Sequence, residues 1–274
     1  MAEHSPKATA TMVRSGWLAD HIRPVYSPVL VILSPPRCGS TAVSRAFWQH
    51  PAFRWYAHEP CDSVYHREGG AADVIQAIEE GVDTASIPGS ATSGNGIIIK
   101  EMTFQADGLL PELVAAATLP VLFTVRDPRL SIRSRMRQRE HGGQPPLFPP
   151  AESGWHALDA ALALVRDARI PHAIVEFDRL CADPAAVTRA ACRRLGLRFV
   201  PEMLSWESAR AIPLGQLGPE QRHWYERVLA STGFERPAGT PPPVGSFPAD
   251  HGIRAHVAEC LGIYERVLAE PGTI

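Results

Sequence analysis

Residues 29–49 are Val29-Leu-Val-Ile-Leu33, Ser34-Pro-Pro-Arg-Cys-Gly-Ser-Thr41 and Ala42-Val-Ser-Arg-Ala-Phe-Trp-Gln49. The first run is apolar and β-branched, as in a buried strand, and the last has the apolar spacing of a helix. The turn between them opens a helix whose first N–H groups have no internal partners and point outward. Because the helix dipole adds partial positive charge there, this stretch predicts an anion site.

The turn itself carries residue types suited to a phosphate or sulfate group. Gly39 lacks a Cβ, so the backbone can bend and approach an oxygen closely. Arg37 supplies a permanent charge with a planar fork of donors, and Ser40 and Thr41 add hydroxyls at the start of the helix. The loop differs from the GxxxxGK[ST] motif of P-loop nucleotidases, because Arg37 precedes the glycine and no lysine stands before Ser40.

Four apolar runs are predicted as buried strands, each ending near a polar or charged residue: Val29–Ser34, Gly96–Lys100, Val121–Arg126 and His172–Phe177. Between them lie segments with helical spacing, including Thr41–Gln49, Glu152–Arg169 and Ala185–Leu195. This alternation predicts an α/β fold in which helices cover both faces of a mainly parallel central sheet. Ligands of such sheets bind beyond the carboxyl ends of the strands.

A second anion site is predicted where the third of these strands ends. Arg126 follows the apolar run, and Asp127-Pro128 caps and begins a helix expected at Arg129–Glu140. If the strands run parallel, Arg126 lies on the same sheet edge as Arg37. The helix carries Arg129, Arg133 and Arg137 at intervals of four, a spacing that predicts a solvated basic face.

The overall composition is that of an ordinary globular protein, with 274 residues, 45% hydrophobic and 20% charged. A formal charge of −2 gives no general attraction to nucleic acid or to an anionic membrane. Residues 1–24 lack the apolar core of a secretory signal. The five cysteines (Cys38, Cys61, Cys181, Cys192 and Cys260) have no metal-binding spacing, so we expect reduced thiols and a cytoplasmic location.

Two of these segments resemble the sulfotransferases. Pro36-Arg-Cys-Gly-Ser-Thr41 is similar to the family's 5′-phosphosulfate-binding loop, and Val125-Arg-Asp-Pro-Arg-Leu-Ser-Ile-Arg-Ser134 to its 3′-phosphate-binding segment. A weaker similarity covers Ile174-Val-Glu-Phe-Asp-Arg-Leu180, with Asp183-Pro184 after it. The resemblance implies a single sulfotransferase-like domain over residues 1–274, with residues 1–24 as an N-terminal arm and residues 200–274 as a less distinctive C-terminal part.

The resemblance implies 3′-phosphoadenosine 5′-phosphosulfate (PAPS) as donor, adenosine 3′,5′-bisphosphate as product and no required metal. Its donor-binding residues would be Arg37, Cys38, Gly39, Ser40, Thr41, Arg126 and Ser134. Cys38 departs from the serine common at its position and lacks that strong hydroxyl donor. The acceptor is expected to be a hydroxyl or amine of a small molecule, with no nucleic acid or membrane as partner, and the oligomeric state is open.

Cytosolic sulfotransferases place their catalytic histidine two residues after a lysine, a position held here by Met102. The chain is more similar to the protein-tyrosine and some bacterial branches, in which a glutamate shortly follows a His-Pro pair. His50-Pro51 is present, so the resemblance implies Glu59 as general base and Lys100 as the catalytic cation. His58 and Glu101 stay open as alternative bases.

The sequence leaves two alternatives to PAPS-dependent transfer open. One is a P-loop kinase or nucleotide phosphotransferase, and the other is a protein that binds PAPS or the bisphosphate without turnover. The aromatic residues Phe53, Trp55, Tyr56 and Tyr65 could line an acceptor pocket or belong to the core. Loops are expected at Gly81–Gly96, His141–Pro150 and Arg236–Gly252, either as plain surface or as a lid over the acceptor.

Overall fold

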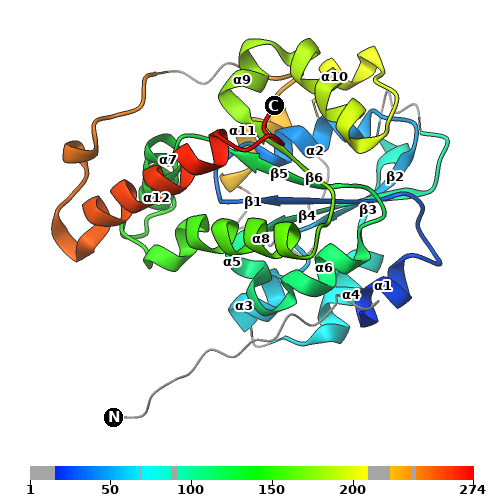
Figure 1. The fold of residues 1–274 in the computed structure, drawn as a ribbon, viewed down its shortest axis with the longest axis horizontal. Helices are drawn as coiled ribbons and strands as arrows, with labels where there is room; N and C mark the ends of the chain where they lie inside the picture. Colours follow the sequence, from blue (N-terminus) through cyan, green and yellow to red (C-terminus); the bar gives the residue numbers. More distant parts are fainter. Residues whose placement is uncertain (1–15, 68, 88–91, 209–222, 236–238) are drawn as a thin grey trace.

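A six-stranded sheet in the order β3-β2-β4-β1-β5-β6 forms the centre of the computed structural model (Figure 1). The structure describes residues 16–67, 69–87, 92–208, 223–235 and 239–274. The strands are β1 (Val29–Ser34), β2 (Phe53–His58), β3 (Val82–Asp83), β4 (Gly96–Met102), β5 (Val121–Val125) and β6 (His172–Glu176). The strands pair in parallel except for β3, which runs antiparallel to β2. The predicted α/β class with a mainly parallel sheet is confirmed.

Helices cover both faces of this sheet (Figure 1). They are α1 (Trp17–Ile22), α2 (Ser40–Trp48), α3 (Asp62–Arg67), α4 (Ala71–Glu79), α5 (Thr103–Ala106), α6 (Leu110–Ala116), α7 (Pro128–His141), α8 (Trp155–Asp167), α9 (Phe177–Ala182), α10 (Pro184–Leu195), α11 (Glu226–Ala230) and α12 (Ile253–Leu268). Short 3₁₀ turns include η3 (Pro150–Ser153). No helix in the described residues combines the length and apolar character needed to cross a bilayer.

The side chains of β1 show how the alternation of a strand builds two separate cores. Val29, Val31 and Leu33 belong to a core with residues of α1, α4, α6, α8 and α12. Leu30 and Ile32 point the other way and pack with residues of α2, α9, α10 and α11. Because β1 is covered on both faces, its run is apolar throughout.

The main differences from the sequence prediction lie beside β4. The strand β2 was missed because Arg54 and His58 interrupt its apolar pattern, and the aromatic residues there were considered only for a pocket or the core. The loop expected at Gly81–Gly96 is wrong at its start, where Val82 and Asp83 pair with β2. Residues 88–91 of that loop, and residues 236–238 of the loop expected at Arg236–Gly252, lie outside the described residues.

Smaller corrections concern the ends of elements. The strand predicted to Arg126 ends at Val125, and the one predicted to Phe177 ends at Glu176. The helix expected at Glu152–Arg169 is α8 preceded by η3.

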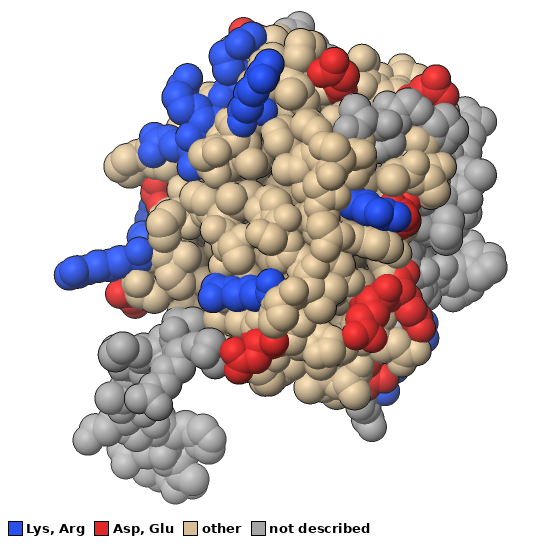
Figure 2. Space-filling model, turned by 90° about the vertical axis from the view of Figure 1, so that its right-hand side faces the viewer, with Lys and Arg blue, Asp and Glu red and all other residues tan. Residues whose placement is uncertain are grey.

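Figure 2 shows a face on which basic and acidic side chains gather in separate small groups without a continuous basic surface.

Candidate active site

A cavity of about 400 Å³ lies beyond the carboxyl ends of β1, β4 and β5. This is the position at which open parallel sheets bind their ligands. The cavity is lined by residues from the loop after β1, the end of β4, the segment after β5 and a late segment near α11. They include Arg37, Gly39, Ser40, Thr41, Glu59, Lys100, Arg126, Ser134, Trp224 and Tyr225.

The loop after β1 brings the N-terminus of α2 to the cavity wall. Its N-cap residue, Gly39, has φ +84° and offers no side-chain acceptor to the helix N–H groups. A Cβ at this position would stand 2.2 Å from the ring of Phe177, so both the backbone conformation and the close approach require glycine. Ser40 and Thr41 are the first two residues of α2 and line the cavity. The N-terminus of α2 therefore faces the cavity, as the predicted anion site requires.

The side chain of Arg37 lines the cavity and contacts both α7 and the late segment. Its Nε donates to Oγ of Ser134 at 3.2 Å, and its Nη1 donates to the carbonyl oxygen of Trp224 at 2.7 Å. Burial lowers the pKa of Arg37; Tyr225 opposes this effect, while the nearby charges of Arg126 and Arg135 add to it. Three guanidinium groups close together form a region where an anion would be stabilised.

Arg126 lies just past the end of β5, on the sheet edge that it was predicted to share with Arg37. Its Nε is 3.2 Å from Oδ1 of Asp178, and its guanidinium stacks 6.0 Å from the centre of the Phe177 ring. Arg126 and Ser134 both line the cavity, although the hydrogen bond that Ser134 makes is with Arg37. The structure thus brings together the two residues predicted for the 3′-phosphate.

Glu59 forms a buried polar cluster with its neighbour His58 and with residues from two distant parts of the chain. Its Oε1 contacts Nζ of Lys100, accepts a 2.6 Å hydrogen bond from the hydroxyl of Tyr225 and lies 3.3 Å from Nε2 of His58. Burial raises the pKa of Glu59, but Lys100, His58 and Tyr225 outweigh that effect and the pKa is lowered overall. The side chain is therefore an ionised carboxylate at neutral pH, in the form that accepts a proton.

The two alternative bases lie away from the cavity. His58 is fully buried, contacts the hydroxyl of Tyr56 through Nδ1 and has its pKa lowered to about 3 by burial. Glu101 points to the face of β4 opposite Lys100, where it accepts hydrogen bonds from the N–H groups of Cys61 and Met102 at 2.7 Å. Neither lines the cavity, so their positions favour Glu59.

Cys38 is the predicted donor-binding residue whose side chain does not face the cavity. Its thiol lies 3.7 Å from the carbonyl oxygen of Pro36 within the apolar core, and burial raises its pKa to about 12. Cys38 is not among the residues that line the cavity. The aromatic residues Phe53, Trp55, Tyr56 and Tyr65 likewise do not line the cavity.

Sequence reasoning missed three residues of the site. Tyr225 and Trp224 come from a late segment that carries no motif. Arg135 belongs to the arginine-rich helix but points inward, where it pairs with Glu152 and stacks 4.8 Å from the ring of Phe148. The inward direction of Arg135 could have been predicted, because Arg135 does not share the four-residue spacing of the arginines on the basic face.

Comparison with known proteins gives a match for the second half of the chain. Residues 152–257, which run from η3 into α12, match the family model described as the sulfotransferase domain. Over these residues the chain is similar to the sulfotransferase domain family. The matched residues include Tyr225 and Trp224 and lie after both predicted phosphate-binding segments.

Two solved sulfotransferase domains align with nearly the whole fold. The sulfotransferase domain from the Synechococcus PCC 7002 olefin synthase is 18% identical, with a TM-score of 0.52 over 88% of this chain and 95% of that one. The sulfotransferase domain from the curacin biosynthetic pathway is 14% identical, with a TM-score of 0.49 over 89% and 98%. The first of these alignments shows that the sulfotransferase fold is shared.

A curated relative covers a smaller part of the chain. Branched-chain-amino-acid aminotransferase-like protein 2 of Arabidopsis thaliana is 35% identical over 94 residues, or 34% of this chain. The chain spans only 15% of the length of that relative.

Proposed function

We propose that this protein is a sulfotransferase that transfers a sulfuryl group from PAPS to a hydroxyl or amine of a small acceptor molecule. The observation that supports it best is the arrangement of Arg37, Arg126 and Lys100 around one cavity with the N-terminus of α2. Two arginines and a helix N-terminus suit a donor with anionic groups at two separated positions. A cavity of about 400 Å³ lies in the size range of small-molecule sites.

The positions of the residues support the following donor-binding roles. The N-terminus of α2, with Gly39, Ser40 and Thr41, would hold the 5′-phosphosulfate through backbone N–H groups and hydroxyls. Arg126 and Ser134 would hold the 3′-phosphate. Arg37 reaches from the loop to Ser134 and so would stand between the two anionic ends of the donor.

PAPS supplies an activated sulfuryl group, whose sulfur–oxygen bond to the phosphate breaks as the new bond to the acceptor forms. Glu59 would take the proton that the acceptor hydroxyl or amine loses in this step. Lys100, which contacts Glu59, would stabilise the charge on the transferred group and the leaving phosphate. Tyr225 would hold the Glu59 carboxylate in place through its hydrogen bond.

The test is turnover with sulfur-labelled PAPS and a panel of small hydroxyl and amine compounds. We expect label in at least one acceptor and release of adenosine 3′,5′-bisphosphate in equal amount. A competition experiment with Mg-ATP separates the alternatives. Tighter binding of Mg-ATP would favour a kinase, and tight binding of PAPS without transfer to any acceptor would favour a binding protein without turnover.

A further inference from the structure

A second group of polar side chains lies outside the cavity, where α8 and α12 pack together. His156 belongs to α8, and His256 and Glu259 stand three residues apart on one face of α12. One ligand atom from each of these residues lies within 4.8 Å of the other two. Nothing in the proposed transfer reaction uses these residues.

The distances converge on one carboxylate oxygen. Oε2 of Glu259 lies 3.6 Å from Nε2 of His156 and 4.0 Å from Nδ1 of His256. Ligands of a tetrahedral metal, at about 2.0–2.1 Å from the ion, stand roughly 3.3 Å apart. The side chains of His156 and Glu259 are 56% and 62% exposed, so small rotations can close the remaining gap.

His256 is held in the orientation that a metal ligand requires. It is buried, and its Nε2 lies 2.8 Å from Oγ of Ser153. Ser153 also accepts a hydrogen bond from the N–H of Trp155, and Nε2 lies 3.4 Å from Sγ of Cys260, so both neighbouring atoms can accept a proton that Nε2 carries when a metal occupies Nδ1. A proton on Nε2 leaves the lone pair of Nδ1 directed at Glu259 and His156. Metal-bound histidines in proteins are typically oriented through their second ring nitrogen in this way.

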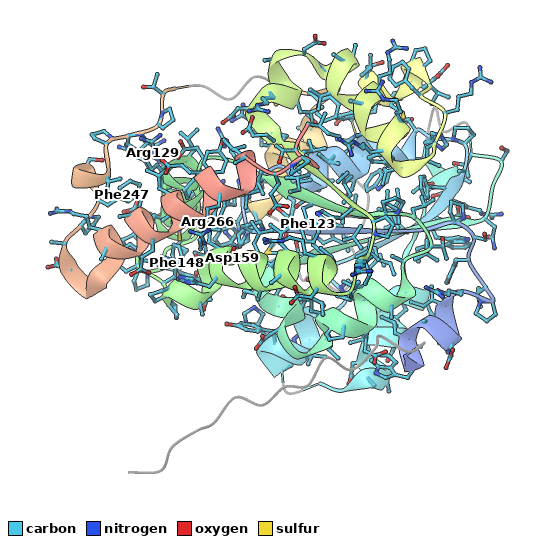
Figure 3. All side chains as sticks on the ribbon, in the orientation of Figure 1. Phe123, Arg129, Phe148, Asp159, Phe247 and Arg266 are labelled. Carbon is cyan, nitrogen blue, oxygen red and sulfur yellow. The ribbon has the colours of Figure 1, made fainter. Side chains whose placement is uncertain are left out.

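A salt bridge already joins the same two helices. Nη2 of Arg266 in α12 lies 3.0 Å from Oδ2 of Asp159 in α8, and Figure 3 shows both residues between the two helices. The three-residue group stands one helical turn from Asp159 along α8 and so forms a separate contact between the same two helices.

We propose that His156, His256 and Glu259 form a binding site for a divalent transition-metal ion of the Zn²⁺ type, joining α8 to α12. Two imidazoles and one carboxylate suit Zn²⁺, Ni²⁺ or Cu²⁺ better than Mg²⁺ or Ca²⁺, which prefer all-oxygen sites. Three protein ligands leave a fourth position for water. The site lies beside η3, whose Glu152 pairs with Arg135 in the cavity wall.

The experiment is titration of the full chain with Co²⁺ after treatment with a chelator, followed by displacement with Zn²⁺. We expect one equivalent of Co²⁺ to give the strong visible absorption of a four-coordinate site and Zn²⁺ to remove it. Zn²⁺ is also expected to raise the melting temperature. His156→Ala and Glu259→Gln change exposed side chains, and each should weaken the affinity by at least about tenfold.

Two further variants make the result specific. Ser153→Ala should weaken metal binding by about tenfold through the orientation of His256. His21→Ala removes an exposed histidine that pairs with Glu79 at 2.9 Å elsewhere on the surface, and it should leave the affinity unchanged. Absence of stoichiometric binding, or equal affinities in the wild type and the His156 and Glu259 variants, would overturn the proposal.

Discussion

The hydroxyl of Tyr225 donates a 2.6 Å hydrogen bond to Oε1 of Glu59, across 166 positions of sequence. Burial and the charge of Glu59 raise the pKa of Tyr225, so it remains a protonated donor. Lys100 contacts the same carboxylate oxygen. The proposed general base is therefore held by a cation from β4 and a hydroxyl from the late segment.

Replacing Tyr225 by phenylalanine should shift the acid limb of the turnover profile to higher pH. The hydrogen bond from Tyr225 helps to lower the pKa of Glu59, so its loss raises that pKa and the base becomes protonated at a higher pH. The measurement is kcat/KM against pH for the wild type and Tyr225→Phe. Tyr65→Phe, at a tyrosine that is 39% exposed, is the matched control. If the acid limb is unchanged in Tyr225→Phe, Tyr225 does not lower the pKa of the catalytic base.

Replacing Glu59 by glutamine should reduce turnover by about 10²–10⁴-fold while binding of adenosine 3′,5′-bisphosphate is kept. Glutamine preserves the shape of the side chain but cannot accept the proton. Glu101→Gln is the control, because Glu101 lies outside the cavity and its pKa is raised to about 8, so it carries a proton at neutral pH. A loss of turnover in Glu101→Gln and none in Glu59→Gln would reverse the assignment of the base.

Glu101 should also make the free energy of unfolding fall as pH rises. Burial and the charge of Glu59 raise its pKa from 4.5 to about 8, so the folded chain keeps a proton that the unfolded chain has lost. Stability therefore decreases between these values, by up to about 1.4 kcal/mol per pH unit. His58, whose pKa is lowered to about 3, acts in the opposite direction below about pH 6.5.

Urea unfolding between pH 6.5 and pH 8 isolates the effect of Glu101 from that of His58. The slope of stability against pH should be flatter in Glu101→Gln than in the wild type, whatever the absolute stability of the variant. Equal slopes would show that Glu101 is already ionised in the folded protein.

Replacing Gly39 by alanine should destabilise the fold and weaken donor binding. The left-handed backbone, at φ +84°, costs a residue with a Cβ about 1–2 kcal/mol, and overlap with the Phe177 ring at 2.2 Å adds to this. Gly143→Ala tests the backbone cost alone, because Gly143 has φ +72° and nothing within 4 Å of an added Cβ. Equal losses of stability in the two variants would show that Phe177 moves aside freely.

The proposed donor half of the site was predictable because each part is contiguous in sequence. The β1 strand, the loop at Arg37–Thr41 and the start of α2 form one uninterrupted segment, and Arg126 directly follows a strand. Parallel pairing of β1 with β5 then places both arginines at one sheet edge. The local sequence patterns, together with the rule that ligands bind beyond the carboxyl ends of parallel strands, were sufficient to predict this half of the site.

The other parts of the site depend on contacts between distant segments. Tyr225 contacts Glu59 across 166 positions of sequence, and His156 contacts Glu259 across 103 positions. Neither pair could therefore be predicted from a local spacing of residues. The strand β2, which positions Glu59, was missed because charged residues interrupt its pattern. The Cys38 thiol points into the core because of the backbone geometry of the loop, and the residue type alone does not predict this direction.

The melting temperature with adenosine 3′,5′-bisphosphate tests whether the cavity binds a nucleotide that carries a 3′-phosphate. At 100 times its dissociation constant, the ligand should stabilise the fold by about 2.7 kcal/mol. We predict a shift that is reduced in Arg126→Ala, unchanged in the exposed control Arg133→Ala and absent with AMP. A shift of equal size with AMP, or one unaffected by Arg126→Ala, would contradict the account.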